Sequence, residues 1–93
     1  MRFLLEWRDQ SGDEHYAIHR VEESLIAASI AIHDLLLDET AWDDGAEEER
    51  PATDVFMDEF GNGRNYDAAM RTADYDPLVL ECQNGTLTVR RLE

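Results

Sequence analysis

The sequence predicts an α+β fold, in which two antiparallel β-hairpins form a four-stranded sheet with one long and one or two short helices packed on one face. Three observations predict it: alternating apolar residues near both ends of the chain, a helical apolar period after the first strand pair, and an Asn-Gly dipeptide within the last pair. At 93 residues the chain is long enough for one core. We therefore expect a single domain over residues 1–93, with an acidic insertion of loop and short helix at about 39–60.

The first hairpin is predicted from two short segments. Residues 2–8 and 15–21 alternate apolar and polar side chains, and a six-residue polar loop with turn-forming residues separates them. Alternate residues of a strand point to the same side, so Phe3, Leu5 and Trp7 share one face. We expect this aromatic-rich face to pair with that of the second strand across the hairpin.

A long helix is predicted over residues 22–38, where the apolar period becomes helical. One stripe contains Leu25, Ala28, Ser29, Ile32 and Leu36, and the neighbouring stripe contains Ile26, Ile30, His33 and Leu37. Ser24 or a neighbouring residue is the expected N-cap. Because residues 25–32 carry no charge, we expect the helix to be covered on more than one side, by the sheet and, in a homodimer, by a second copy of the chain.

The acidic insertion gives a weaker structural signal. Residues 43–51 are rich in Asp, Glu, Gly and Pro, a composition typical of a loop. The segment from Asp54 to Phe60 fits either a helix or a strand, and we favour a short helix capped by Thr53.

A short helix over about 66–73 and a second hairpin complete the predicted fold. The hairpin joins residues 78–83 to residues 86–92. Asn-Gly between two alternating strands favours a two-residue type I′ turn, so we expect Asn84 and Gly85 at the centre of the turn.

Most of the negative charge lies in one segment. The formal net charge is −14, and residues 38–59 contribute −9, against −4 from the residues before them and −1 from those after. The ten carboxylates of this segment are Asp38, Glu39, Asp43, Asp44, Glu47, Glu48, Glu49, Asp54, Asp58 and Glu59, and its one cation is Arg50. A localised anionic surface is either solvated or met by a basic partner, so these ten residues are candidate partner-binding residues.

The same charge argues against two classes of protein. A conventional nucleic-acid-binding protein needs a basic surface to displace counterions from phosphates, and an anionic membrane surface repels acidic proteins.

The apolar runs of the sequence are short. No apolar run approaches the ~20 residues that span a bilayer, and the run at the amino terminus is too short for a signal peptide. We expect a cytoplasmic protein, which also fits Cys82 as the only cysteine.

No motif predicts a metal, a cofactor or a catalytic centre. In the twelve-residue calcium loop of an EF-hand, Gly45 or Gly63 would take the sixth position, but neither register places ligands at all the required positions. His15, His19 and His33 are zinc-ligand types whose spacing matches no zinc motif. The chain has no nucleophile elbow and no phosphate-binding loop, so we expect a protein that is not an enzyme and has no cofactor.

Trp42 lies inside the acidic segment, beside Asp43 and Asp44. A buried Trp42 would anchor the end of the long helix to the sheet, whereas an exposed one would be an aromatic contact residue ringed by carboxylates. The usual distribution of large apolar side chains favours the buried alternative. Trp42 is nevertheless a candidate partner-binding residue because of its position among the acids.

These features predict a non-enzymatic binding protein whose carboxylate surface docks on a basic, nucleic-acid-binding groove of a partner protein and imitates a phosphate backbone. In size, acidity and lack of catalytic residues, the chain resembles the small phage-encoded inhibitors that block restriction or CRISPR effector complexes. The resemblance is compositional, covers no aligned motif, and implies an anti-restriction or anti-CRISPR inhibitor that mimics DNA.

Two alternatives stay open. All eight cations are arginine, which fits a housekeeping protein of a salt-loving organism whose acids only solvate the surface, or a GC-rich genome. The nearly balanced charge after residue 59 argues against salt adaptation. The other alternative is a small acidic interaction domain whose interface lies elsewhere, for example at the exposed edge of the carboxy-terminal hairpin.

Overall fold

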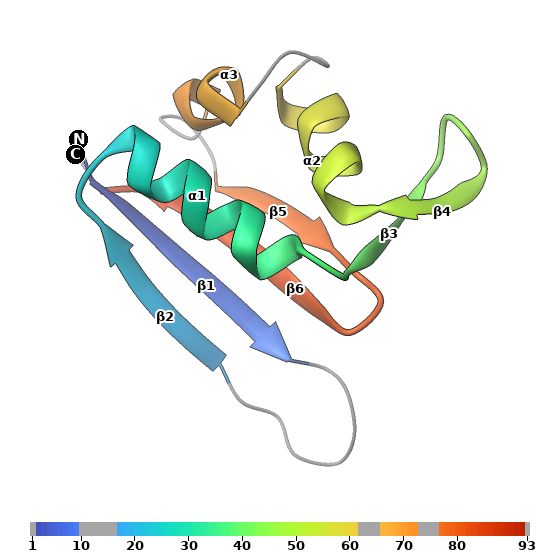
Figure 1. Ribbon diagram of the computed structural model, residues 1–93, viewed down its shortest axis with the longest axis horizontal. Coiled ribbons are helices and arrows are strands. Elements are labelled where there is room, and N and C mark those ends of the chain that lie inside the picture. The colour runs from blue at the N-terminus through green and yellow to red at the C-terminus, as the bar shows by residue number, and fades with distance from the viewer. Residues whose placement is uncertain (1, 10–16, 62–65, 73–76, 93) are drawn as a thin grey trace.

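The computed structural model describes residues 2–9, 17–61, 66–72 and 77–92 (Figure 1). The elements in chain order are β1 (Phe3–Asp9), β2 (Ala17–Glu22), α1 (Leu25–Leu36), β3 (Thr40–Asp43), β4 (Glu48–Pro51), α2 (Ala52–Phe60), α3 (Tyr66–Thr72), β5 (Leu78–Glu81) and β6 (Gly85–Arg91). The predicted α+β class is confirmed. None of the helices in the described ranges is long and apolar enough to cross a membrane.

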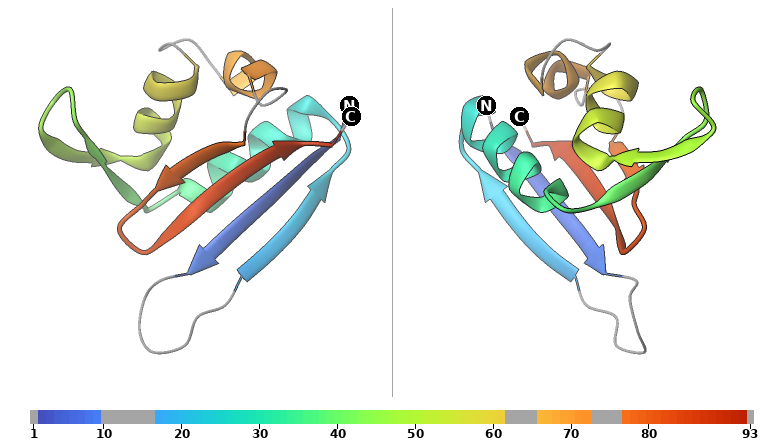
Figure 2. Two further views of the ribbon diagram at one scale, coloured as in Figure 1. Left: turned by 180° about the vertical axis from the view of Figure 1, so that it is seen from behind. Right: turned by 45° about the vertical axis from the view of Figure 1, so that its right-hand side comes forward.

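Four strands form an antiparallel sheet in the order β2-β1-β6-β5, so the first and last strands of the chain lie side by side at its centre. Its buried side chains alternate along the strands, as the sequence predicts for Phe3, Leu5 and Trp7. They join α1, α2 and α3 in one apolar core on one face of the sheet. Seen from behind, the strands lie in front of α1 (Figure 2, left).

α1 is shorter than the predicted helix: it begins at Leu25, after the N-cap Ser24, and ends at Leu36. The Ser24 side chain accepts a hydrogen bond from the Ala27 amide at 3.1 Å, which confirms the expected N-cap. Ala28, Ile32 and Leu36 of the first predicted stripe are buried. The second predicted stripe, by contrast, stays exposed in the described chain.

The prediction of a loop over residues 43–51 holds only for the turn at 44–47, because β3 and β4 form a separate two-stranded sheet on either side of it. The short helix is present as α2, but Thr53 does not cap it. The N-cap position is Pro51, which makes no side-chain cap hydrogen bond. Pro51 is also the last residue of β4, opposite Thr40, so the chain passes directly from strand to helix.

The predicted turn of the second hairpin is also wrong by one residue. Cys82 donates to the Gly85 carbonyl at 2.8 Å, so Gln83 and Asn84 occupy the centre of the turn. Neither has the positive φ of a type I′ turn. Gly85 instead begins β6, where a Cβ atom would collide with the Trp7 ring. Packing between strands therefore sets this register and overrides the local turn preference.

Several predictions fall on residues outside the described ranges. These are most of the first loop, with His15 and Tyr16 beyond it, and the residue at position 73 that was expected to end the short helix. The described part of that helix, α3, begins at Tyr66 as predicted. It contributes Ala69 and Met70 to the core.

Candidate functional site

The acidic hairpin, which we define as residues 40–51 with strands β3 and β4, extends away from the four-stranded sheet (Figure 2, right). Its base is fixed by contacts with the turn after β5. The Gln83 amide donates to the Thr40 carbonyl at 2.8 Å, and Ala41 forms an isolated β-bridge with Cys82. Ala41 is buried, whereas the turn and β4 beyond it carry mostly exposed residues. The hairpin is thus anchored at one end and open at the other.

Glu39, immediately before the hairpin, has a structural partner. Its carboxylate accepts hydrogen bonds from the Asn84 amide at 3.3 Å and from the Asn84 side chain at 3.4 Å. Its carbonyl accepts from the Ala52 amide at the start of α2. Glu39 therefore connects the turn after β5 to the start of α2. Its place in a run of acids did not predict this structural role.

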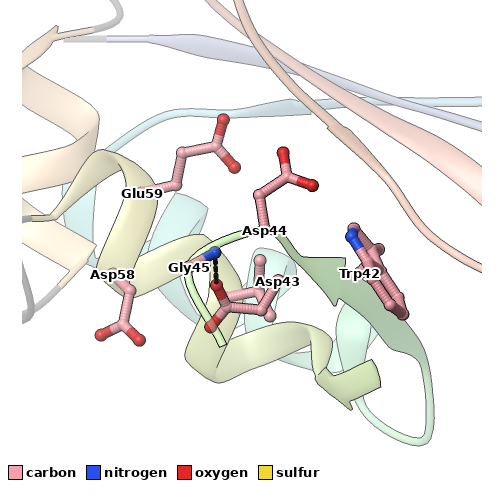
Figure 3. A pocket seen from close by; sticks show the side chains of 7 residues that line it. Trp42, Asp43, Asp44, Gly45, Asp58 and Glu59 are labelled. Atoms are coloured by element: carbon pink, nitrogen blue, oxygen red, sulfur yellow. Dashed lines mark hydrogen bonds between the residues drawn. The ribbon is translucent and has the colours of Figure 1, made fainter. Parts of the chain in front are cut away.

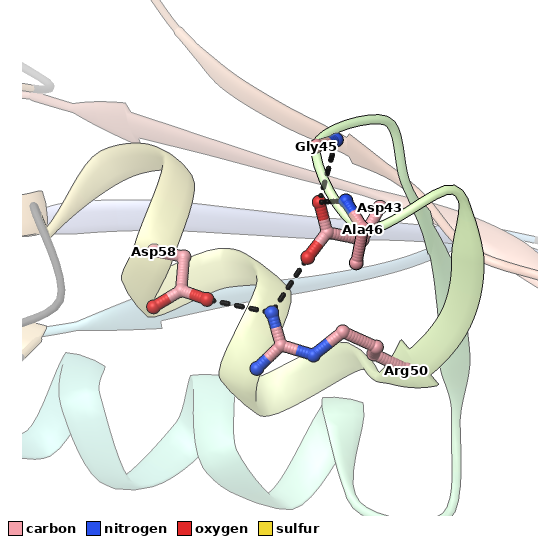
Figure 4. Close-up of polar contacts among 5 residues, drawn as sticks. All are labelled: Asp43, Gly45, Ala46, Arg50 and Asp58. Carbon is pink, nitrogen blue, oxygen red and sulfur yellow. Dashed lines mark hydrogen bonds and ion pairs between the residues drawn. The ribbon is translucent and has the colours of Figure 1, made fainter.

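Arg50 holds two of the predicted carboxylates (Figure 4). Its Nη1 atom donates to Asp43 Oδ2 at 2.6 Å and to Asp58 Oδ2 at 2.7 Å, linking β3, β4 and α2. The other oxygen of Asp43 accepts from the Gly45 and Ala46 amides in the hairpin turn. The hydrogen bond from Arg50 is the main cause that lowers the pKa of Asp43, and both aspartates raise the pKa of Arg50 further. Arg50 therefore pairs with both acids within the fold and offsets one of their two negative charges.

The remaining acids of the segment are exposed. Apart from Asp38, they are Asp44, Glu47, Glu48, Glu49, Asp54 and Glu59, and the side chain of none of them makes an ion pair or hydrogen bond within the described part of the chain. Asp38 lies just after α1, away from the hairpin turn. Asp54 lies in the first turn of α2, where a carboxylate stabilises the positive end of the helix dipole. The uncompensated charge therefore collects around the hairpin turn, β4 and the end of α2.

Trp42 is 54% exposed, so the prediction that it is buried is wrong. The reason is its register: Ala41 takes the inward position on β3, and the next residue must point away from the core. Trp42 instead lies directly opposite Glu49 of β4. Figure 3 shows the Asp44 and Glu59 side chains on the pocket side of the exposed indole.

An open cavity of about 280 Å³ lies between the hairpin and α2 (Figure 3). We call it the Trp42 pocket, and its lining residues are Trp42, Asp43, Asp44, Gly45, Val55, Asp58 and Glu59. A second open cavity of about 430 Å³ shares Trp42, Asp44 and Glu59 with it and continues to Val79, Leu80 and Glu81 of β5. Trp42, Asp44 and Glu59 thus form the border common to both cavities.

The electrostatics of the pocket favour a positively charged group. Partial burial, followed by the nearby charge of Asp44, raises the pKa of Glu59. A cation between these two carboxylates would relieve their repulsion, and the face of the Trp42 ring attracts cations as well. A guanidinium or ammonium group matches this combination of an aromatic face and two unpaired acids.

Other chemistry is poorly supported in the described residues. Burial is the main cause that raises the pKa of Cys82 to about 12, followed by Glu39 and Glu49, so the thiol is protonated at neutral pH and is a poor nucleophile. His19 pairs with Glu6 at 3.5 Å on the sheet face opposite the helices, whereas His33 lies on α1. Within the described ranges, no three His, Cys, Asp or Glu side chains are close enough to hold a metal ion.

Two contributors to the site were missed at the sequence level. Arg50 was recognised only as the single cation among ten acids, and its position opposite Ala41 in the unexpected β4 strand gives it its role. Val55 supplies an apolar wall of the Trp42 pocket from α2. An arginine isolated in an acidic run was the available signal for the first, and no comparable signal exists for the second.

The carboxylates predicted together are thus divided by the structure. Trp42, Asp44 and Glu59 meet at the pocket, Glu47, Glu48 and Glu49 lie on the hairpin, and Asp43 and Asp58 are held by Arg50. Comparison with known proteins found no matching family model, no similar curated protein and no similar solved structure.

Proposed function

We propose that the chain is a non-enzymatic binding protein that docks the acidic hairpin and the Trp42 pocket on a basic groove of a partner protein. The observation that carries this proposal is the exposed Trp42 beside Asp44 and Glu59, two carboxylates that no cation in the described residues compensates. Exposed tryptophans at the centre of a contact are typical binding hot spots.

The arrangement of charge supports a partner that binds nucleic acid. Successive residues of a strand advance by ~3.4 Å, which is also the rise along the helix axis per phosphate of one strand of duplex DNA. Glu47, Glu48 and Glu49 follow one another at the turn and along β4, although their side chains alternate between faces. A groove lined by Arg and Lys to accept phosphates would accept these carboxylates. In this proposal the protein inhibits its partner by occupying the groove in place of DNA or RNA, as anti-restriction and anti-CRISPR inhibitors do.

The distribution of charge favours this function over salt adaptation. A surface that is acidic only for hydration should be acidic on every element, but the strands of the four-stranded sheet carry four carboxylates and four arginines. Six acids without an ion pair in the described residues belong instead to the hairpin and α2, whereas the unpaired acids of α1 and its flanks are Glu23, Asp34 and Asp38. Localised charge of this kind steers association with an oppositely charged partner.

The test is displacement of a labelled 20-base-pair duplex from a panel of restriction and CRISPR effector complexes, followed by fluorescence anisotropy. We expect the protein to displace the duplex from at least one complex, with an affinity that falls as salt increases. The variant carrying Asp44→Asn, Glu47→Gln, Glu48→Gln and Glu49→Gln should lose about tenfold or more in association rate. It should remain folded, because these side chains are exposed.

A control variant removes the same number of charges outside the hairpin, with Glu6→Gln, Glu22→Gln, Glu23→Gln and Asp34→Asn, all on described residues of β1, β2, and α1 or just before it. It should keep the association rate within about twofold, because the proposal assigns binding to the hairpin and not to net charge. Equal losses in both variants, or no displacement from any complex, would contradict the proposal. Trp42→Ser should weaken binding by about thirtyfold through faster dissociation, as expected for a hot-spot residue worth about 2 kcal/mol.

A further inference from the structure

The outward side of α1 carries an apolar surface that the fold leaves uncovered. Ile26, Ile30 and Leu37 are 71%, 59% and 54% exposed. With His33 they are spaced by four, three and four residues, so they form one seam along the helix, opposite the buried Ala28, Ile32 and Leu36. Single exposed apolar residues are ordinary, but a continuous seam of large ones is typical of a surface for another helix.

One residue of the seam, His33, contacts α3. The His33 ring meets the Tyr66 ring of α3 edge to face, with centroids 6.5 Å apart. This contact keeps one part of the seam against α3, while Ile26 and Ile30 on the first turns of α1 remain open. The seam belongs to a different element from the acidic hairpin and shares no residue with the Trp42 pocket.

Among the residues of α1 and those that flank it, charge lies only at the two ends of the seam. No charged residue occurs from Leu25 to Ile32, whereas Glu23 precedes the seam and Asp34 and Asp38 lie at its other end. All three acids are exposed, and none has an ion pair in the described part of the chain. The complementary surface is therefore an apolar stripe with a cation at each end.

A second copy of the chain does not supply that complement. An antiparallel pair of α1 helices that matches Ile26 with Leu37 would place Asp34 and Asp38 of one copy near Glu23 of the other. A parallel pair would place Glu23 against Glu23. Both arrangements bring carboxylates together between two chains of net charge −14.

We propose that the α1 seam is a docking site for an amphipathic helix of a partner protein, one with an apolar stripe at helical spacing and Lys or Arg at both ends. Ile26, Ile30 and Leu37 pack against the stripe, as in other cases where helices are recognised through residues spaced by three and four. Glu23 at one end and Asp34 with Asp38 at the other meet the basic ends and set the direction in which a helix with unequal ends binds.

The test uses three 20-residue helical peptides that share one leucine stripe and differ only in the residues at both ends, which are Lys, Gln or Glu. Binding to the full chain is measured by isothermal titration calorimetry at low salt. We expect the Lys peptide to bind at least tenfold more tightly than the Glu peptide. The variant with Glu23→Gln, Asp34→Asn and Asp38→Asn should lose most of that difference.

The double variant Ile26→Ser, Ile30→Ser should lower the affinity for the Lys peptide at least tenfold and keep the circular dichroism spectrum, because both side chains are exposed. Val21→Ser is the matched control, since Val21 is 49% exposed and lies on the opposite face of the sheet, paired with Leu4. Three results would overturn the proposal: no binding of the Lys peptide, equal binding of all three peptides, or sedimentation equilibrium showing a dimer that the double variant converts to a monomer.

Discussion

The four-stranded sheet and the acidic hairpin with α2 differ in what holds them together. The strands of the sheet have as many arginines as carboxylates and bury an apolar side chain at nearly every second position of β1, β5 and β6. Residues 40–60 carry eight carboxylates and one arginine, and within the two hairpin strands only Ala41 is buried. The sheet depends on apolar packing, whereas the hairpin depends on Arg50 and on its anchored base.

This difference separates stability from charge within one small chain. Carboxylates that repel one another would destabilise a shared core, and here they lie on an element whose outer part contributes little to the core. The charged surface can therefore be altered with little effect on the fold. The predictions below test that separation, from the largest expected effect to the smallest.

A single charge should unfold the body of the protein. Ile32 is fully buried between α1 and the sheet, so Ile32→Asp buries a carboxylate without a cation and should cost more than about 4 kcal/mol. The expected result is loss of the cooperative thermal melt in circular dichroism. Ile30→Asp, two residues earlier on the exposed side, should keep that melt. If both variants stayed folded, the assignment of the buried side of α1 would be wrong.

Glycines in the two regions should respond differently to an added methyl group. In Gly85→Ala the new Cβ would collide with the Trp7 ring and lie 2.7 Å from the Arg8 carbonyl oxygen, so we expect a loss of about 1–3 kcal/mol. The matched change Gly45→Ala meets only Asp43 Oδ1, at 3.4 Å, and should cost much less. Urea unfolding of both variants measures the difference. Equal losses would show that the hairpin packs as tightly as the sheet.

Arg50→Gln should loosen the hairpin and leave the sheet intact. The change leaves Asp43 and Asp58 facing each other without a cation, so the melting temperature should fall by less than in Gly85→Ala. Because the loss is electrostatic, it should shrink as sodium chloride is added. Arg90→Gln on β6 is the control, since Arg90 is exposed and makes no ion pair within the described residues. A deficit that is independent of salt would mean that Arg50 acts mainly through packing.

The smallest expected effect is a pH dependence at Glu59. Its pKa is raised in the folded state, so the folded protein binds this proton more tightly than the unfolded chain, and stability falls as pH rises through the folded pKa. Glu59→Gln should therefore gain stability relative to the natural chain as pH rises above the ordinary glutamate value of about 4.5. The pKa of Asp43 is lowered in the folded state, so its contribution to stability is lost as pH falls, in a lower pH range. Urea unfolding from pH 4.5 to 7 measures the difference, and a constant difference would contradict the prediction.

Much of the body could be predicted from sequence because its signals are local. Alternating apolar residues place β1, β5 and β6, and Ser24 before an apolar helical period places α1. β3 and β4 could not be predicted, because Asp and Glu are rare in strands and the pair is held by Ala41 and Arg50. The Gln83-Asn84 turn depends on contact between Trp7 and Gly85, which are distant in the sequence.

The sequence was enough to locate the site in a charged segment. It was not enough to predict which side chains of that segment contact one another. Sequence cannot divide the ten acids into those that Arg50 or Asn84 contacts and those that stay unpaired in the fold, because the division depends on the register of β4 and on the turn after β5. The exposure of Trp42 follows from the inward position of Ala41, which is known only once β3 is placed. These contacts bring residues that are separated in the acidic segment together at the Trp42 pocket.

The pairing of β1 with β6 also governs how the chain can fold during synthesis. Phe3 pairs with Arg91, so the centre of the sheet stays open until β6 has left the ribosome. During that interval β1 has an unpaired edge and an uncovered apolar face, which are the features that promote aggregation of nascent chains. The acidic segment emerges well before β6, and repulsion between its like charges opposes association of neighbouring nascent chains. We therefore expect this segment to counter aggregation during synthesis, before β6 completes the sheet.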